Sequence, residues 1–258
     1  MRNPIAHAVL RTMKLRSKGL SREDLAYRVL PSFFLELITK YLRVTCVGLE
    51  KIPKKGPVIV IANHSGFMGF DALMIVHQIH GKLKRLPRII AHKMWFIRPE
   101  ISVPARKMGL VPATMDNGFK ILEKGQCLLL FPEGEEGNFK PSTQAYKLRR
   151  FRRGFVRLAL RTGAPIIPSV VIGAEESNIN LSQIRWAKHV VGIIVPVPLN
   201  VIPLPARWHI EFLDPIYLEK DPEKAEDIEY VTRLAREIRR KLQKQLHTTL
   251  KNRKTIFL

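Results

Sequence analysis

The chain has 258 residues, of which 46% are hydrophobic and 26% are charged, a composition that fits one packed domain and excludes a disordered or collagen-like chain. Its 44 Lys and Arg against 22 Asp and Glu give a net charge of +22, which attracts polyanions such as nucleic acid or anionic lipid. The two cysteines, Cys46 and Cys127, each lie within an apolar run, which excludes a disulfide framework and favours a reducing compartment.

Residues 1–43 are predicted to form basic, amphipathic helices. A helix start is indicated at Ser21, where a capping residue precedes acidic residues. In the next segment, SFFLELITKYLRV (32–44), apolar residues recur at helical spacing on one face, with charged residues opposite. Such a stripe can pack on the protein's own core or, given its basic flanks, dock to a membrane interface.

No apolar run indicates a membrane-spanning helix or a secretory signal. A spanning helix needs roughly 18 to 20 apolar residues, and the best candidate, residues 189–206, contains four prolines. The first residues are basic but lack a compact apolar stretch before a cleavage site. We therefore expect a cytoplasmic protein that is peripheral on the inner leaflet of a membrane and bound to its anionic surface.

From residue 44 onwards, short apolar runs alternate with helical patterns. The runs are VTCVGL (44–49), PVIVIA (57–62), RIIAH (88–92), CLLLF (127–131), APIIPSVVIG (164–173) and WHIEFL (208–213). Helices are predicted at 71–83, 116–125, 151–163 and 225–246, the last with a buried stripe of Ile228, Val231, Ala235, Ile238 and Leu242. This alternation predicts an α/β domain over 44–258, including the basic C-terminal helix, with a largely parallel central sheet flanked by helices on both faces.

The stretch NHSGFMGFD (63–71) directly follows an apolar strand. In open α/β sheets, functional residues lie beyond the carboxyl ends of the strands. His64 can accept a proton from a hydroxyl if a carboxylate holds its other ring nitrogen, and Asp71 is the nearest candidate. The alternative is structural, because Asp71 before an apolar helix is also a good helix cap.

A second apolar strand ends in FPEGEEGNFKPS (131–142). Glu133 and Gly134 form its turn, Lys140 lies nearby, and a basic cluster that includes Arg152 and Arg153 follows. An acidic side chain beside several cations suggests a site that orients a hydroxyl-bearing, anionic ligand. A solvent-exposed turn is the alternative.

Taken together, these stretches resemble the phospholipid and glycerol acyltransferases typified by the lysophosphatidic acid acyltransferases. Four segments over roughly residues 44–220 carry the resemblance, in matching order: NHSGFMGFD (63–71), AHKMWF (91–96) leading to MGLVPAT, FPEG (131–134) and RTGAPIIPSVVIG (161–173). The combination of FPEG with a later TGAPIIP is far more specific than a lone His and Asp at this spacing.

The resemblance implies an O-acyltransferase without a metal or cofactor. Its general base is His64, oriented by Asp71, its acyl donor is acyl-CoA or an acyl-carrier protein, and its acceptor is a glycerolipid or glycerophospholipid hydroxyl. The implied substrate-binding residues are Asn63, Ser65, Gly66, Lys93, Phe131, Pro132, Glu133, Gly134, Lys140, Arg152 and Arg153.

The sequence departs from the family pattern at two places. Six residues separate His64 from Asp71, where the family usually has four, and Glu135 and Glu136 stand where the family usually has Thr-Arg, whose Arg contacts the acceptor's phosphate. Lys140 or an arginine of the basic cluster could supply that charge, or the acceptor is a neutral glycerolipid or a glycolipid.

Two alternatives of other classes remain open at this stage. The charge also fits a nucleic-acid binder, but no zinc-finger, helix-turn-helix or RNA-binding pattern occurs, so nucleic acid is an unexpected partner. A lipid-binding protein that kept the fold and lost the chemistry is the other. A metal hydrolase is disfavoured, since His77 and His80 lack a third ligand at a compelling spacing.

Overall fold

The computed structural model describes residues 29–65, 69–253 and 255–257. Seven strands form one sheet in the order β1-β9-β6-β2-β5-β3-β4. The strands are β1 (Thr45–Val47), β2 (Val58–Ala62), β3 (Arg88–Ala91), β4 (Leu110–Pro112), β5 (Cys127–Leu130), β6 (Ile166–Ile172) and β9 (His209–Phe212). Neighbours run parallel except β6 and β9, which are antiparallel. The predicted α/β fold with a largely parallel sheet is confirmed.

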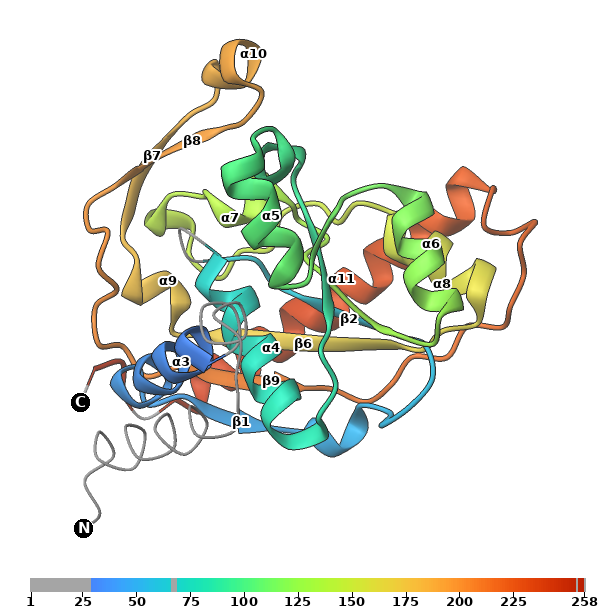
Figure 1. Ribbon diagram of the computed structural model, residues 1–258, viewed down its shortest axis with the longest axis horizontal. Helices are drawn as coiled ribbons and strands as arrows, with labels where there is room; N and C mark the ends of the chain where they lie inside the picture. The colour runs from blue at the N-terminus through green and yellow to red at the C-terminus, as the bar shows by residue number, and fades with distance from the viewer. Residues whose placement is uncertain (1–28, 66–68, 254, 258) are drawn as a thin grey trace.

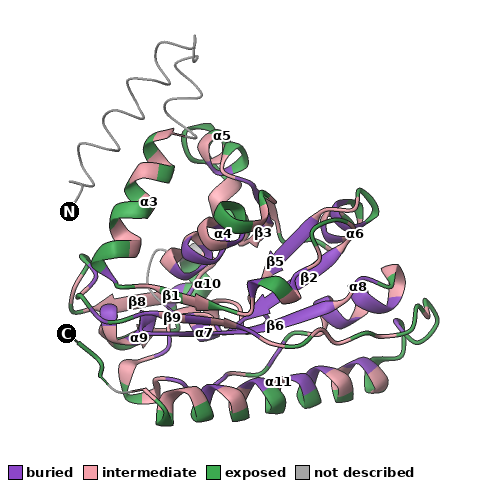
Figure 2. Ribbon diagram, turned by 90° about the horizontal axis from the view of Figure 1, so that it is seen from below, coloured by how far each residue is buried: buried purple, intermediate pink, exposed green. Residues whose placement is uncertain are grey.

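The central strands are apolar along their whole length because both faces of the sheet are covered. Every residue of β2 and of β6 is buried, as expected for parallel strands between two layers of helices. One face carries α3 (Leu30–Tyr41), α4 (Phe70–Leu83) and α5 (Pro99–Lys107), and the other carries α6 (Met115–Glu123), α8 (Gly154–Thr162) and α11 (Ile228–Lys251), as Figures 1 and 2 show.

Helix α11 begins and ends later than the sequence predicts. Its buried stripe consists of Val231, Ala235, Ile238, Leu242 and Leu246. Ile228, predicted for this stripe, is 63% exposed, because it is the first residue of the helix, directly after the capping Asp227. The stripe therefore runs one turn further toward the C-terminus than expected.

Helix α3 has two apolar faces. Leu35 and Ile38 pack against the core on the α4 side of the sheet. Leu30, Phe34, Leu37 and Tyr41 are exposed along the opposite side, so the single apolar face predicted from the periodicity is divided between the core and the surface. The helix start predicted at Ser21 lies outside the described residues, and the division of the chain at residue 43 stays a prediction.

Several short elements were not predicted from the sequence. The segment 178–206 forms an arm of β7 (Asn180–Ile184), α10 (Ala187–Val191) and β8 (Val195–Pro198), in which the two strands pair antiparallel as a separate sheet. The short helices are η2 (Leu49–Lys51), η4 (Lys93–Phe96), α7 (Glu135–Asn138), η5 (Ser142–Gln144) and α9 (Ala174–Ser177). Within the described ranges, every helix is too short or too polar to cross a membrane.

Candidate active site

Three neighbouring strands bring candidate site residues to one edge of the sheet. His64 follows β2, Phe131 and Glu133 follow β5, and His92 follows β3, and these strands are parallel neighbours in the order β2-β5-β3. Their carboxyl ends therefore lie side by side. This is the edge at which open α/β sheets place their ligands.

His64 and Asp71 are brought into direct contact. The Nδ1 atom of His64 lies 2.7 Å from Oδ2 of Asp71, whose side chain is fully buried. The same carboxylate accepts hydrogen bonds from the backbone N–H of Ser65 (2.9 Å) and of Ala72 (2.8 Å). With neutral imidazole, an N–H at Nδ1 donates to Asp71 and leaves the Nε2 lone pair to accept a proton.

The sequence offered a helix cap as the alternative role of Asp71, but Asp71 is not the N-cap of α4. Gly69 is the N-cap, with φ +71°, and Asp71 lies in the first turn of the helix. A carboxylate there is stabilised by the helix dipole and by the free backbone N–H groups. The Asp71 side chain therefore both stabilises α4 and contacts His64.

The ring of His64 is fixed by stacking. It lies against the ring of Phe131, with centroids 4.1 Å apart and planes inclined by 21°. The His64 side chain is 16% exposed. Among the described residues, none forms a hydrogen bond to Nε2, so this nitrogen is free to meet a ligand.

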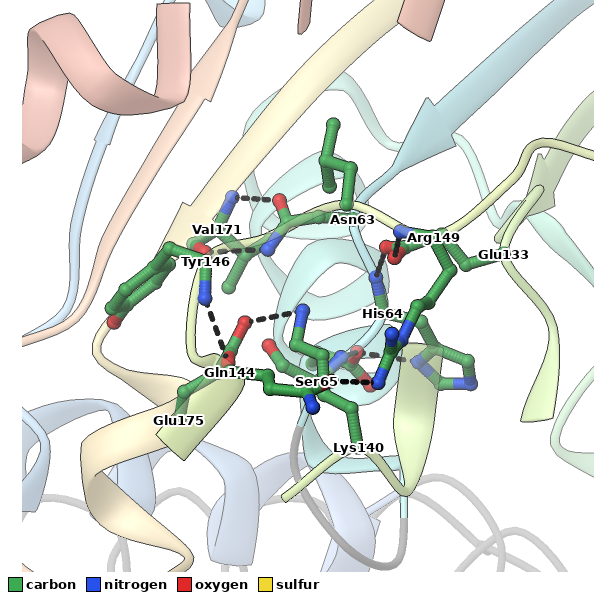
Figure 3. Close-up of polar contacts among 12 residues, drawn as sticks. Asn63, His64, Ser65, Glu133, Lys140, Gln144, Tyr146, Arg149, Val171 and Glu175 are labelled. Atoms are coloured by element: carbon green, nitrogen blue, oxygen red, sulfur yellow. Dashed lines mark hydrogen bonds and ion pairs between the residues drawn. The ribbon is translucent and has the colours of Figure 1, made fainter. Parts of the chain in front are cut away.

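Glu133 has a structural role that differs from the predicted ligand contact. It is 1% exposed, and its Oε1 accepts a hydrogen bond from the backbone N–H of His64 (3.0 Å) while Oε2 accepts one from that of Arg149 (2.6 Å) (Figure 3). A Cβ atom on Gly137 would lie 2.5 Å from the Glu133 Cβ, so a glycine is needed beside it. Through these two hydrogen bonds, Glu133 connects the backbone of His64 to that of Arg149.

Asn63 is also structural. It is fully buried, its Nδ2 donates to the carbonyl of Val171 (2.8 Å), and its Oδ1 accepts from the Val171 N–H (2.7 Å) (Figure 3). This pair continues the contact of β2 with β6 beyond the end of β2. Both ends of the amide are occupied by Val171, and the predicted substrate contact of Asn63 stays a prediction.

Lys140 is buried rather than exposed to a ligand. Its ammonium is 2% exposed and lies 2.8 Å from Oε1 of Glu175, whose Oε2 accepts from the Tyr146 N–H. Burial raises the pKa of Glu175 to about 7, although the Lys140 ammonium acts in the opposite direction. The Lys140 ammonium thus faces a buried carboxylate of this chain, and its predicted contact with a substrate phosphate stays a prediction.

Glu135 and Glu136 bind the arm. Glu136 pairs with Arg185, and Glu135 pairs with Lys188 and accepts from the Ile194 N–H (3.2 Å). Burial by itself raises the pKa of Glu135, but the bonds to Lys188 and Ile194 outweigh it and hold the pKa below its ordinary value. The two residues in the place of the family's Thr-Arg are thus occupied by cations of this chain.

An arginine-lined cavity of about 450 Å³ adjoins the FPEG turn, and its wall holds four arginines and two glutamates: Arg150, Arg152, Arg153, Arg157, Glu133 and Glu136. Arg157 pairs with Glu226, and Arg153 donates to Thr232 at 3.3 Å. Arg152 is exposed and lies over Gly134, where an added Cβ would be 3.2 Å from its Cζ. The backbone N–H of Arg152 donates to the carbonyl of the buried Pro132 (2.8 Å).

His92 is a candidate site residue that sequence reasoning missed. Burial lowers its pKa, with a smaller opposing effect from the Glu135 carboxylate and smaller reinforcing effects from the cations Lys93, Arg152 and Lys188. Lys93, predicted as a ligand contact, is exposed at the start of η4. The position of His92 directly after a parallel strand, as for His64, was the available signal. Gly66, also predicted, lies outside the described residues.

Comparisons with known proteins identify relatives of this chain. Residues 43–172 match the family model "Acyltransferase". An uncharacterised protein of Mycobacterium tuberculosis (strain ATCC 25618 / H37Rv) is 36% identical over 247 residues, which cover 89% of this chain and 67% of the relative. Phytyl ester synthase 2 of Arabidopsis thaliana is 32% identical over 137 residues, which cover 50% of this chain and 19% of that protein.

A solved structure supports the fold. The 1-acyl-sn-glycerophosphate acyltransferase PlsC of Thermotoga maritima superposes with a TM-score of 0.57 over 93% of this chain and 88% of that one, at 19% identity. The family model spans half of the chain, and the mycobacterial relative matches nearly all of it. This chain belongs to the acyltransferase family.

Proposed function

We propose that the protein transfers a fatty acyl group from acyl-CoA or an acyl-carrier protein to a hydroxyl of a glycerolipid-type acceptor, with His64 as the general base. The observation that carries the proposal is the buried Asp71 carboxylate 2.7 Å from His64 Nδ1. A histidine held in this way, with its other nitrogen free at the carboxyl edge of the sheet, is arranged to accept a proton.

The chemistry needs no covalent enzyme intermediate. His64 Nε2 takes the proton of the acceptor hydroxyl as the oxygen attacks the thioester carbonyl. The new C–O bond forms, the C–S bond breaks, and the leaving thiolate takes the proton back from the imidazolium. Asp71 stabilises the imidazolium during these steps, and stacking on Phe131 holds the orientation of the His64 ring.

The arginine-lined cavity supplies the charge for the anionic part of a substrate. Arg152 is the best placed side chain, because it lies over Gly134, next to the turn that holds His64. Arg153 and the exposed Lys93 add positive charge at the same edge. The phosphates of the acyl donor and of a phospholipid acceptor are both suitable ligands.

The acceptor is open between a phosphorylated and a neutral alcohol. The names of two relatives point to different reactions. The Arabidopsis protein is named a phytyl ester synthase, and a Borreliella burgdorferi protein is named a 1-acyl-sn-glycerol-3-phosphate acyltransferase. The latter is 26% identical over 138 residues, which cover 49% of this chain and 50% of that one. Because Glu135 and Glu136 replace the Thr-Arg pair whose Arg usually contacts the acceptor's phosphate, we include a neutral long-chain alcohol among the acceptors to be tested.

An anionic membrane surface is the proposed place of action. The net charge of +22 attracts such a surface, and the exposed Leu30, Phe34, Leu37 and Tyr41 of α3 give an apolar stripe for the interface. We propose a cytoplasmic, peripheral location on the inner leaflet.

The test is a thiol-release assay with acyl-CoA and acyl-carrier protein as donors, with liposome-embedded acceptors and products identified by mass. His64→Ala should lower the acceptor-dependent rate by roughly 10²–10⁴-fold. His80→Ala is the matched control, since His80 is an exposed histidine of α4 far along the helix from Asp71. Lipid binding without acyl transfer across the whole panel would instead favour a non-catalytic lipid-binding protein.

A further inference from the structure

The arm formed by residues 178–206 extends away from the body of the molecule. Its two strands pair from Asn180 with Pro198 to Ile184 with Val195, and α10 lies at the tip (Figure 1). The strands form their own two-stranded sheet and add nothing to the central one. A two-stranded ribbon by itself is at best marginally stable in water, so contacts elsewhere must hold it.

The arm exposes large apolar side chains instead of burying them. Trp186 is 70% exposed and Val190 is 75% exposed at the tip, and Leu181, Leu199, Val201 and Ile202 are each more than half exposed along its length. Apolar surface of this extent on one projecting element marks an interaction site. The aromatic residue at the tip is tryptophan, the side chain enriched at membrane–water interfaces.

The arm also carries no negative charge. From Ser177 to Ile210 the sequence contains no Asp or Glu, whereas Arg185 and Lys188 flank Trp186. Both cations are paired with carboxylates of the body, so the arm adds no uncompensated charge of either sign to a chain whose net charge is +22. An apolar element without carboxylates of its own, on such a chain, is complementary to the headgroup region of an anionic bilayer, which attracts the cationic protein and accepts apolar side chains.

The arm is anchored to the candidate active site. Arg185 and Lys188 pair with Glu136 and Glu135, which directly follow the FPEG turn. At its base, the hydroxyl of Tyr41 donates to the carbonyl of Pro203 (2.9 Å), which joins the arm to the exposed stripe of α3. The apolar surfaces of α3 and of the arm are therefore linked, and the arm's orientation is set by residues that directly follow the turn in contact with His64.

We propose that this arm is a membrane-docking element, which inserts Trp186 and Val190 into the interfacial layer of an anionic bilayer. This arm would be the contact surface for the lipid partner, and only in that respect does the proposal rest on the function proposed above. Glu135 and Glu136 take the arm's cations in place of a substrate phosphate, and they thereby fix the distance between the bilayer and the His64 edge.

The experiment measures contact of Trp186 with lipid directly and needs no turnover. The full chain is mixed with phosphatidylcholine–phosphatidylglycerol vesicles with or without bromine on the acyl chains, and tryptophan quenching is recorded. The chain has three tryptophans, of which Trp208 is 1% exposed and Trp95 is partly buried. Wild type should be quenched, and Trp186→Phe should lose most of the quenched component while still binding vesicles.

A second variant tests the energetic contribution of the tip. Trp186→Ser with Val190→Ser should weaken vesicle binding by roughly ten-fold or more, because two exposed apolar side chains no longer leave water on binding. The matched control is Leu86→Ser with Tyr217→Ser, which removes two exposed apolar residues near the amino ends of β3 and β6, at the opposite end of the sheet. Its binding should equal that of wild type, and thermal melts confirm that each variant is folded.

The proposal is overturned if quenching is the same in wild type and Trp186→Phe, or if the tip and control variants lose binding equally. It is also overturned if wild type ignores the vesicles and instead dimerises through the tip, with a dimer in sedimentation that the tip variant lacks. Lipid contact by Trp186 in a protein without acyl transfer would uphold the docking surface while the proposed function fails.

Discussion

Replacing Asp71 with asparagine separates its contact with His64 from its structural role. In wild type, one buried carboxylate accepts from His64 Nδ1 (2.7 Å), Ser65 N and Ala72 N. Asparagine retains one oxygen but turns an NH₂ group toward donors, so at least one of these bonds is lost and the charge that stabilises the imidazolium disappears.

The magnitude follows from the bonds that are lost. A hydrogen bond to a charged group contributes about 1.5–3 kcal/mol, which alone corresponds to roughly 10–10²-fold in rate. The unfavourable ring tautomer adds to this, so we expect kcat to fall by about 10²–10³-fold. A destabilisation of about 2 kcal/mol should lower Tm by roughly 4–8 °C in a domain of this size.

The assay pairs kcat from thiol release with Tm from calorimetry for Asp71→Asn and for Asp116→Asn. Asp116 is an exposed carboxylate in the first turn of α6, so it shares the helix-dipole contribution but has no histidine partner. The control should keep kcat and lose only a small part of Tm. If Asp71→Asn also lowers Tm while kcat stays at the wild-type value, Asp71 only stabilises the helix and the catalytic pairing is refuted.

Three further predictions concern the supports of the site. Gly137→Ala should destabilise the protein by about 1–3 kcal/mol in denaturant unfolding, because its Cβ would lie 2.5 Å from that of Glu133, whereas Gly81→Ala, with open space around it, should be neutral or stabilising; equal effects would contradict the packing argument. The pKa of Glu175 is raised from 4.5 to about 7, so its contribution to stability is fully present below pH 4.5 and is lost as pH rises toward 7. The free energy of unfolding of Glu175→Gln relative to wild type should therefore increase over this window by up to roughly 3 kcal/mol, measured by denaturant unfolding at each pH, and a difference that does not change with pH would refute the assignment. Burial raises the pKa of both cysteine thiols to about 12, so neither should react with a disulfide reagent at pH 8 until the protein unfolds.

The parts of the fold that sequence reasoning predicted are those with a strong local signal. The runs VIVIA and IIPSVVI are buried over their whole length in β2 and β6, because a strand covered on both faces must be apolar throughout. The arm was missed because its strands leave apolar residues exposed and include prolines, such as Pro196 and Pro198. Strand β4 has three residues, too few to show any periodicity.

The sequence indicated which residues gather at the site better than it indicated what each residue contacts. The position of His64 directly after a strand indicates a site residue. Its partner Asp71 is only seven residues away, so the pairing could be predicted from a short stretch of sequence. The partner of Lys140 is Glu175 and that of Glu135 is Lys188, and such pairs depend on which loops the fold brings together. A short sequence window therefore indicates that a charge is present but not whether it is compensated.

The most direct test of the central claim is the acceptor-dependent, mass-identified acyl transfer of wild type beside His64→Ala, with His80→Ala as the control. The account predicts ester formation by wild type and by the control, and a loss of roughly 10²–10⁴-fold for His64→Ala with an unchanged melt. Ester formation by a folded His64→Ala protein at the wild-type rate would contradict it.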